Sequence, residues 1–258
     1  MHIFVINLEK DQARRESIAK QLQDLKLEFE IIKGIYGATM SVEERQRDYA
    51  DGKAKWRCSR SLVPAEIGCA LSHINVYKIM AERQLKSALI LEDDVVLPTN
   101  LKELLKDCSN VLDTQQAQVW LLSTASGYSR PKTTIRINKE HLLLPYQSGY
   151  FTSSYLLTLP AAQALLKDLY PVRDVADCWQ RMHRYRVVDL FVFDPPVIEQ
   201  DQVLFGSSTT SDIQSLAFLN YTSKIIYKAR RARSILWEAG YSRYRKWLRP
   251  YSGTKLNP

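Results

Sequence analysis

The sequence predicts an α/β fold built on a substantially parallel sheet, and two observations support that prediction. Short apolar runs alternate along the chain with longer segments whose apolar side chains recur at helical spacing, the pattern of strands connected by helices. One run, Ala88–Leu91, is apolar throughout, as expected of an interior strand. At 258 residues the chain can bury a sizeable core as one large domain, or as one domain with a small extension.

Each predicted element has a local reason in the sequence. His2–Asn7 is a short apolar run typical of a strand, and residues 11–25 carry apolar side chains three and four positions apart, as on one face of a helix. Ser41 precedes two glutamates that suit the first turn of a helix, and Pro64 suits the first turn of a longer one. The remaining predicted elements are strands at 29–33, 87–91, 118–122 and 187–193, helices at 41–48, 64–84, 101–112 and 160–169, and shorter antiparallel strands within 132–159.

The composition argues against several classes of protein. A hydrophobic fraction of 45% is too high for a disordered chain, and no apolar stretch approaches the roughly 18 residues that a membrane span needs. The start of the chain, Met1–Asn7, lacks the basic segment and cleavage site of a signal peptide, so we expect a cytoplasmic protein. The four cysteines form no CxxC pair, and the group Cys58, Cys69 and His73 lacks the spacing of a standard zinc site. We therefore expect reduced thiols in the core.

Positive charge is concentrated at the carboxyl-terminal end of the chain. Residues 221–258 hold ten Lys or Arg and one Glu, a net charge of +9, which leaves −1 for residues 1–220. Aromatic and aliphatic side chains are interleaved with these cations, a composition suited to an anionic membrane surface. Nucleic-acid binding and a solvated helix whose aromatics pack on the body are the alternative interpretations. We expect a domain at 1–210 and, at 211–258, a basic, mostly helical extension that binds membranes and not nucleic acid.

Three consecutive carboxylates, Glu92, Asp93 and Asp94, follow the predicted interior strand. Adjoining negative charges repel one another unless a cation lies among them, and hard cations such as Mg²⁺ and Mn²⁺ bind carboxylate oxygens. In open α/β sheets, ligands bind at the carboxyl ends of the strands, where this triplet is expected. The triplet therefore suggests a divalent metal site, and the alternative is a solvated acidic turn.

The helix predicted from Pro64 carries a second group of polar side chains. Glu66 and His73 are seven residues apart, so two helical turns place them on one face with Cys69 between them. Gly68 lies inside the helix at a cost of about 1 kcal/mol relative to Ala, which indicates that another part of the chain approaches it closely. The alternative is that Glu66 caps the helix and His73 is a hydrogen-bonded core residue.

Several blocks of this sequence resemble one enzyme family. The most specific are Glu66–His73 and Leu91–Val95; the weaker ones are Val5–Leu8 with Arg14 and Arg15, Ser153–Thr158 ahead of Pro160–Ala162, Asp177, and Pro196–Gln200. In this order and separation they resemble the bacterial glycosyltransferases that build lipooligosaccharide, glycosyltransferase family 25, which is shared with collagen galactosyltransferases. The resemblance covers roughly residues 2–205 and leaves the basic tail outside.

The resemblance implies a single Rossmann-like nucleotide-sugar transferase domain of the GT-A type. It implies an inverting, metal-dependent transfer of a hexose, usually galactose from UDP-galactose, to a hydroxyl of a lipooligosaccharide or lipopolysaccharide glycan. A Mn²⁺ or Mg²⁺ ion would neutralise the departing diphosphate. In these terms we expect Asp94 to be the metal ligand. The other residues expected around the donor are Asn7, Arg14, Glu66, His73, Glu92, Asp93 and Gln200.

Inversion by direct displacement needs a base that takes the proton of the attacking hydroxyl. We expect that base to be Asp177, with Trp179 available to stack on a sugar face. Asp174 is close enough in sequence to be the alternative base. The ordinary interpretation of the pair is that Asp174 caps a helix whose first turn holds Asp177.

Two functions of other classes remain open at this point. A metal-dependent phosphohydrolase would use the same acidic strand end, and a non-catalytic membrane-surface adaptor would use the basic tail alone. The chain has no GxxxxGK[ST] loop, which argues against a P-loop kinase or ATPase. Binding of UDP that depends on Mn²⁺ separates a transferase from both alternatives. If the protein acts on a lipid-linked glycan, we expect it at the inner face of the bacterial inner membrane.

Overall fold

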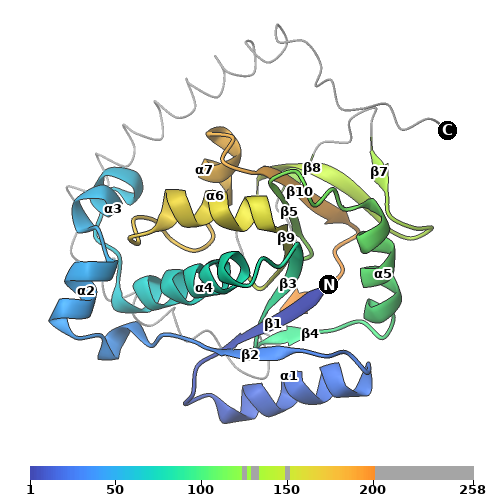
Figure 1. Ribbon diagram of the computed structural model, residues 1–258, viewed down its shortest axis with the longest axis horizontal. Helices are drawn as coiled ribbons and strands as arrows, with labels where there is room; N and C mark the ends of the chain where they lie inside the picture. The colour runs from blue at the N-terminus through green and yellow to red at the C-terminus, as the bar shows by residue number, and fades with distance from the viewer. Residues whose placement is uncertain (124–126, 129–133, 149–151, 201–258) are drawn as a thin grey trace, which may run out of the picture. The chain divides into compact units, whose positions relative to one another are not determined.

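The computed structural model describes residues 1–123, 127–128, 134–148 and 152–200, so the predicted extension at 211–258 lies outside the described residues (Figure 1). Helices cover both faces of a central sheet. On one face, side chains of α4 (Pro64–Glu82), α6 (Leu159–Leu169) and α7 (Trp179–Arg184) form a core with the sheet. On the other face, α1 (Gln12–Asp24) and α5 (Leu101–Val111) form a second core. The α/β prediction is confirmed.

The strands follow the order β2-β1-β3-β9-β5-β10-β8-β6, with β7 also paired to β8. Pairing is parallel between β1 and β2, β1 and β3, and β5 and β10, and the order β2-β1-β3 with β1 between its neighbours is the Rossmann-like part of the sheet. The strands of this sheet are β1 (His2–Asn7), β2 (Glu30–Lys33), β3 (Ser87–Glu92), β5 (Gln118–Leu121), β6 (Gly127–Tyr128), β7 (Ile135–Arg136), β8 (Leu142–Ser148), β9 (Ser154–Thr158) and β10 (Asp189–Asp194).

The sheet is mixed, which corrects the prediction of a substantially parallel one. Strand β9 runs antiparallel between β3 and β5, and β8 is antiparallel to β10. All five residues of β9 are buried, and a strand that is buried on both faces can run in either direction, so its composition carries no information about strand direction. The antiparallel strands predicted within 132–159 are confirmed.

The predicted helices are present, together with two short ones, α3 (Asp51–Cys58) and α7, that were not among them. Helix α2 (Val42–Asp48) begins with the predicted Ser41 cap, whose hydroxyl accepts from the backbone of Glu44 while that glutamate accepts from the backbone of Ser41. Helix α3 was missed because it carries no long apolar stripe, and α7 was considered only as a helix capped by Asp174, four residues before Cys178, which precedes its observed start. None of the described helices has the length and hydropathy of a membrane-spanning segment.

The expected close approach at Gly68 is confirmed. A Cβ atom on Gly68 would lie 2.3 Å from the carbonyl oxygen of Ile35 and 2.6 Å from the nitrogen of Gly37, so only glycine fits. The hydroxyl of Ser72 accepts from the Ile35 backbone at 2.8 Å and donates to the Gly68 carbonyl at 2.7 Å. These contacts hold the loop that follows β2 directly against the amino-terminal half of α4.

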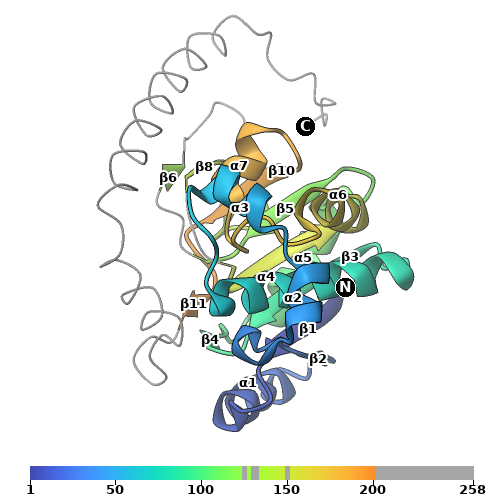
Figure 2. The ribbon, with the colours of Figure 1, turned by 90° about the vertical axis from the view of Figure 1, so that its left-hand side faces the viewer.

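A two-stranded ribbon extends the chain beyond β3. Strand β4 (Val95–Val96) pairs antiparallel with β11 (Glu199–Gln200), and Figure 2 shows the two side by side. The side chain of Gln21 in α1 holds this ribbon by donating to the Val95 carbonyl and accepting from the backbone of Leu97. The ribbon brings two residues that are 106 positions apart, Asp94 and Gln200, into contact.

Candidate functional site

The carboxyl ends of β1 and β3 bring together four of the predicted site residues: Asn7, Arg14, Asp93 and Asp94. The strands are parallel, with Ile6 level with Glu92, so the residues that follow them meet at one edge of the sheet. The amide of Asn7 donates to the carboxylate of Asp93 at 2.7 Å. The guanidinium of Arg14 lies 3.5 Å from Asp93 and 3.6 Å from Asp94.

Asp93 is nearly buried and faces other residues of the chain. Burial raises its pKa to about 6, with further increases from Asp94 and Glu92, while Asn7 and Arg14 act in the opposite direction. One carboxylate oxygen accepts from Asn7 and the other faces Arg14. The structure thus places Asp93 where it orients these two side chains.

Asp94 has one oxygen with a partner and one without. Its Oδ2 accepts from the amide of Gln200 at 2.9 Å, while its Oδ1 is buried and has no hydrogen-bond partner among the described residues. Burial, and next the charge of Glu92, raise the pKa of this carboxyl. A buried carboxylate oxygen without a donor is costly, and a bound cation would satisfy it. The predicted metal ligand therefore has the open oxygen that such a role needs.

Glu92 begins a chain of polar groups that runs into the core. Its Oε1 accepts from Thr152 at 2.5 Å and lies 3.3 Å from Nε2 of His73. The Nδ1 of His73 is 2.8 Å from the hydroxyl of Tyr155, which in turn is 2.9 Å from that of Tyr77. His73 is buried and fully engaged, so its ring orientation is set by Tyr155 and Glu92 together.

The thiol of Cys69 lies close to His73 and Glu92 and is influenced by several acidic groups. Burial raises its pKa well above the ordinary value, and the charges of Glu92, Asp177, Glu66 and Asp94 raise it further. The donor atoms of Cys69, His73 and Glu92 lie within 4.8 Å of one another, a grouping that could hold a metal ion.

Glu66 has a structural partner as well as its place beside Cys69. Its two oxygens accept from the guanidinium of Arg60 at 2.6 and 2.5 Å, and one of them also accepts from the backbone of Val63 at the start of α4. The helix-capping alternative for Glu66 is therefore what the contacts show. Arg60 was not predicted from the sequence, because a single arginine in a loop carries no recognisable pattern.

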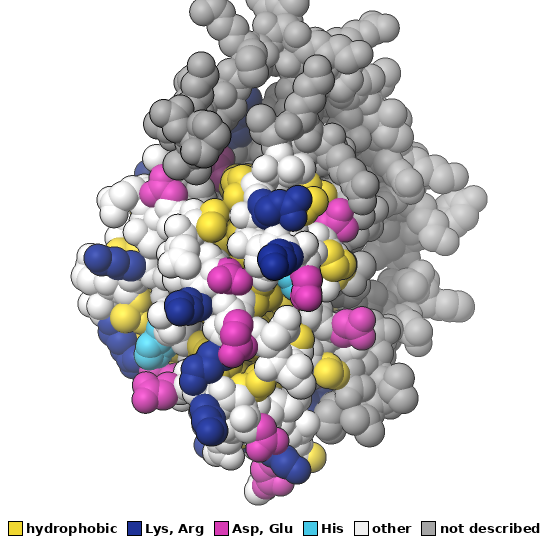
Figure 3. All heavy atoms as spheres, turned by 90° about the vertical axis from the view of Figure 1, so that its right-hand side faces the viewer, with side chains coloured by type: hydrophobic (Ala, Val, Ile, Leu, Met, Phe, Trp, Pro, Cys, Tyr) yellow, Lys and Arg dark blue, Asp and Glu magenta, His cyan; other side chains and the backbone are white. Residues whose placement is uncertain are grey.

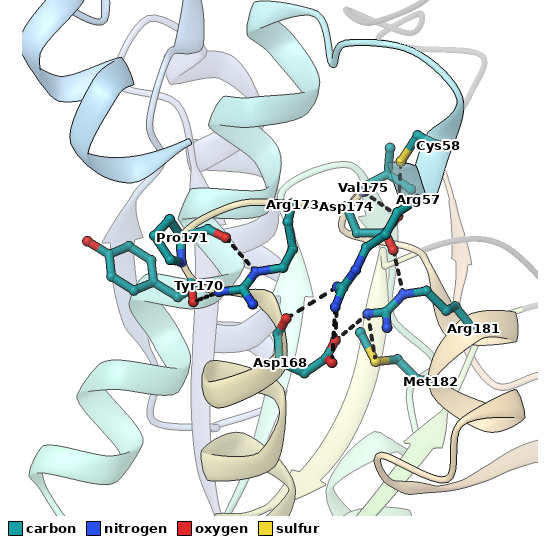
Figure 4. Close-up of polar contacts among 10 residues, drawn as sticks. All are labelled: Arg57, Cys58, Asp168, Tyr170, Pro171, Arg173, Asp174, Val175, Arg181 and Met182. Atoms are coloured by element: carbon teal, nitrogen blue, oxygen red, sulfur yellow. Dashed lines mark hydrogen bonds and ion pairs between the residues drawn. The ribbon is translucent and has the colours of Figure 1, made fainter. Parts of the chain in front are cut away.

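Asp174 belongs to an ion-pair network that joins three helices (Figure 4). Its carboxylate accepts from Arg181 at 2.5 Å, from the thiol of Cys58 at 3.2 Å and from the backbone of Val175 at 3.0 Å. With its oxygens occupied and its side chain buried, Asp174 has little room to act as a base. It does not cap α7 either, because that helix begins at Trp179 after Cys178.

Trp179 is not available to a sugar, which corrects the expectation that it stacks on one. Its side chain is 1% exposed and its ring packs edge-on against Tyr155, with centroids 5.3 Å apart. The ring turns inward because α7 packs its apolar side on the sheet. Tyr155 and Thr152, which support His73 and Glu92, were missed as individual site residues although their neighbourhood at 153–158 was recognised.

The part of the chain that holds these residues is similar to known proteins. The family model for Glycosyltransferase family 25 (LPS biosynthesis protein) matches residues 1–180. Procollagen galactosyltransferase 1-A of Xenopus laevis is 27% identical over 174 residues, which are 64% of this chain and 28% of that protein. Procollagen galactosyltransferase 2 of Homo sapiens is 27% identical over 168 residues, 64% of this chain and 27% of the relative.

A third relative shows that membership of the family does not by itself establish activity. A protein of Rattus norvegicus named "Probable inactive glycosyltransferase 25 family member 3" is 23% identical over 193 residues, 74% of this chain and 32% of that protein. The chain thus spans less than a third of the length of these relatives.

Among solved structures, the likenesses are weak. A glycosyltransferase involved in the glycosylation of the major capsid of PBCV-1 has a TM-score of 0.37 and 11% identity, over 84% of this chain and 98% of that one. Mouse xyloside xylosyltransferase 1 has a TM-score of 0.36 and 15% identity, over 74% and 84%. At these scores neither likeness bears on fold or function.

The family match spans all the site residues described above except Gln200, from Asn7 at the end of β1 to Asp177 before α7. It also covers more than two thirds of the sequence. On this basis the chain belongs to glycosyltransferase family 25.

Proposed function

We propose that this chain is an inverting, metal-dependent glycosyltransferase that moves galactose from UDP-galactose onto a hydroxyl of a lipooligosaccharide or lipopolysaccharide glycan. The observation that carries the proposal is the buried Oδ1 of Asp94, just after β3, which has no hydrogen-bond partner among the described residues. It lies in a chain that belongs to glycosyltransferase family 25. The procollagen galactosyltransferases among its relatives support galactose as the sugar.

The residues around Asp94 fit a hard divalent cation. Asp94 offers a carboxylate oxygen without a hydrogen-bond partner among the described residues, and an oxygen donor of this kind suits Mn²⁺ or Mg²⁺. When bound, the ion would supply charge neutralisation for the departing diphosphate. Gln200 donates to the other oxygen of Asp94, which fixes the carboxylate and leaves Oδ1 for the ion.

The remaining groups have distinct tasks in this proposal. Asn7 and Arg14, oriented by Asp93, contact nucleotide groups of the donor at the edge of the sheet. The carboxylate of Asp177 takes the proton of the acceptor hydroxyl as that oxygen attacks the sugar carbon. Because the carboxylate of Asp174 is bonded to Arg181 and Cys58, we assign the base to Asp177 and not to Asp174.

The basic segment at 221–258 supports a location at a membrane. On the face drawn in Figure 3, cationic and anionic side chains of the described residues are interspersed, in keeping with the near-zero net charge of residues 1–220. The +9 segment therefore provides the positive charge that an anionic surface attracts. We propose that it docks the enzyme on the inner face of the inner membrane, where a lipid-linked acceptor would be found.

A donor screen tests the proposed function. The protein is incubated with a set of UDP-sugars and Mn²⁺, and release of UDP is measured first without acceptor and then with lipooligosaccharide-type sugars. We expect UDP release that requires UDP-galactose, metal and acceptor together. Release of inorganic phosphate from nucleotides would favour a phosphohydrolase, and absence of any metal-dependent UDP binding would favour a non-catalytic adaptor.

A further inference from the structure

A thiol, an imidazole and a carboxylate converge beside the proposed donor site. Cys69 and His73 are one turn apart on α4, so their side chains lie on one face, and Glu92 meets them from the end of β3. All three donor atoms lie within 4.8 Å of one another, and no other such group of three is found in the part of the chain that the structure describes.

The spacing of two of these donors already matches a tetrahedral metal ion. Bonds of about 2.0–2.2 Å to nitrogen and oxygen place neighbouring ligand atoms of a zinc ion roughly 3.3 Å apart. The Nε2 of His73 and Oε1 of Glu92 are 3.3 Å apart. The sulfur of Cys69, one turn earlier on α4, lies within 4.8 Å of both atoms.

A second layer of contacts fixes the histidine in the orientation that a metal ligand needs. The Nδ1 of His73 is bonded to the hydroxyl of Tyr155, which leaves Nε2 directed at Glu92. Tyr155 is held in turn by Tyr77, and both rings are buried. Histidine ligands usually have such a partner on the ring nitrogen that faces away from the metal.

We propose that Cys69, His73 and Glu92 form a zinc site separate from the oxygen-only site at Asp94. Sulfur and nitrogen donors select Zn²⁺ over Mg²⁺ and Mn²⁺, and three protein ligands leave a fourth position open. Binding takes the proton of the Cys69 thiol into solvent. Because Glu92 also borders the proposed donor site, zinc here inhibits donor binding; only this consequence rests on the proposed function.

Cobalt spectroscopy tests the site without any use of activity. Metal-free full-length protein is titrated with Co²⁺, a coloured substitute for zinc, and the thiolate-to-cobalt charge-transfer absorption is followed until Zn²⁺ displaces it. We expect a charge-transfer band in the wild type that saturates at one equivalent of metal bound at the thiolate site. Cys69→Ser should lose the band and weaken zinc binding about 10²-fold or more. Cys108→Ala, which changes a buried thiol of α5 on the opposite face of the sheet, should keep both.

Absence of the thiolate band in the wild type would overturn the proposal whether or not the variants fold. So would equal zinc affinity in wild type and folded Cys69→Ser. Asp94→Asn keeps the proposed zinc ligands and should retain the band while losing Mn²⁺-dependent UDP binding. The cobalt titration, done without nucleotide, tests the zinc site, and the UDP titration with Mn²⁺, done without zinc, tests the donor site. Failure of one site is therefore distinguishable from failure of the other.

Discussion

At the scale of single residues, each of the three consecutive carboxylates has its own set of contacts. Glu92 meets His73 and Thr152 in the core, while Asp93 meets Asn7 and Arg14. Of the three, Asp94 alone has a buried oxygen without a hydrogen-bond partner among the described residues. Adjacent side chains at a strand end point in different directions. Two carboxylates of the triplet can therefore be held by other side chains while the third keeps an oxygen for a metal ion.

The first prediction concerns Asp94. Asp94→Asn should abolish Mn²⁺-dependent UDP binding and transfer, because it removes the charge of the open oxygen without changing side-chain volume. The fold should be kept, since loss of a buried charge relieves a desolvation cost. Asp24→Asn, an exposed aspartate of α1, is the matched control and should leave both unchanged. Retention of more than a few per cent of wild-type turnover would remove Asp94 from the metal site.

The second prediction separates the two aspartates ahead of α7. Asp177→Asn should lower turnover by about 10²-fold or more with donor affinity little changed, the usual effect of losing a general base. Asp174→Asn should instead lower the free energy of unfolding, by about 2 kcal/mol, because it breaks the buried bonds to Arg181 and Cys58. Steady-state kinetics and urea unfolding of both variants decide between them. A stable Asp174→Asn protein without turnover would transfer the role to Asp174.

At the scale of elements, α4 is positioned by the backbone contact at its first turns. Gly68→Ala should destabilise the protein even though alanine favours a helix by about 1 kcal/mol, because the new Cβ would overlap the Ile35 carbonyl. Gly52→Ala in α3 is the matched control: nothing lies within 4 Å of its Cβ position, so the variant should gain up to about 1 kcal/mol. Urea unfolding measures both, and a Gly68→Ala protein as stable as the wild type would contradict the tight contact.

The ion pairs that join α3, α6 and α7 predict a pH dependence. Burial raises the pKa of Asp168, but Arg181 and Arg57 outweigh it and hold the pKa below its usual value of 3.8. Between the two pKa values the unfolded chain binds more protons, so this stabilisation is present above about pH 4 and is lost as the pH falls through the folded pKa. Asp168→Asn should cost about 2 kcal/mol at pH 7, less than a fully buried pair because the group is partly exposed.

Thermal unfolding at pH 7 and pH 3 measures this dependence. The difference between wild type and Asp168→Asn should shrink as the pH falls. Glu9→Gln, which breaks the fully exposed pair with Lys33, is the control and should leave the melting temperature unchanged at both values. A difference that stays constant between the two pH values would mean that Asp168 does not keep its charge through these ion pairs.

At the scale of the whole molecule, the charge asymmetry predicts a separable membrane function. Deleting residues 221–258 removes a net +9 and should abolish binding to anionic vesicles, while transfer to a small soluble acceptor is kept. Binding by the full chain should weaken as salt rises, because the attraction is screened. Vesicle flotation decides it. Equal binding by both proteins, or preference of the tail for nucleic acid, would contradict the membrane proposal, and unfolding on truncation would mean that the tail packs on the body.

The sequence by itself determined which segments become strands and the longer helices, because apolar periodicity and capping residues act over a few neighbouring positions. It also placed the carboxylate triplet at a strand end and Glu66, Cys69 and His73 on one helix face, since both follow from local geometry. The close approach at Gly68 was visible as a glycine where the helix would favour alanine.

Only the tertiary structure decided which groups meet across the chain. Strand β9 enters antiparallel, Trp179 turns into the core, and β4 pairs with β11 to bring Gln200 to Asp94. Arg181 and Cys58 donate to the carboxylate of Asp174, and His73 in the middle of α4 meets Glu92 at the end of β3. These outcomes depend on contacts between residues that are far apart in the chain. Several alternative pairings of such residues are similar in energy until the whole core is assembled, so no local sequence pattern predicts which one forms.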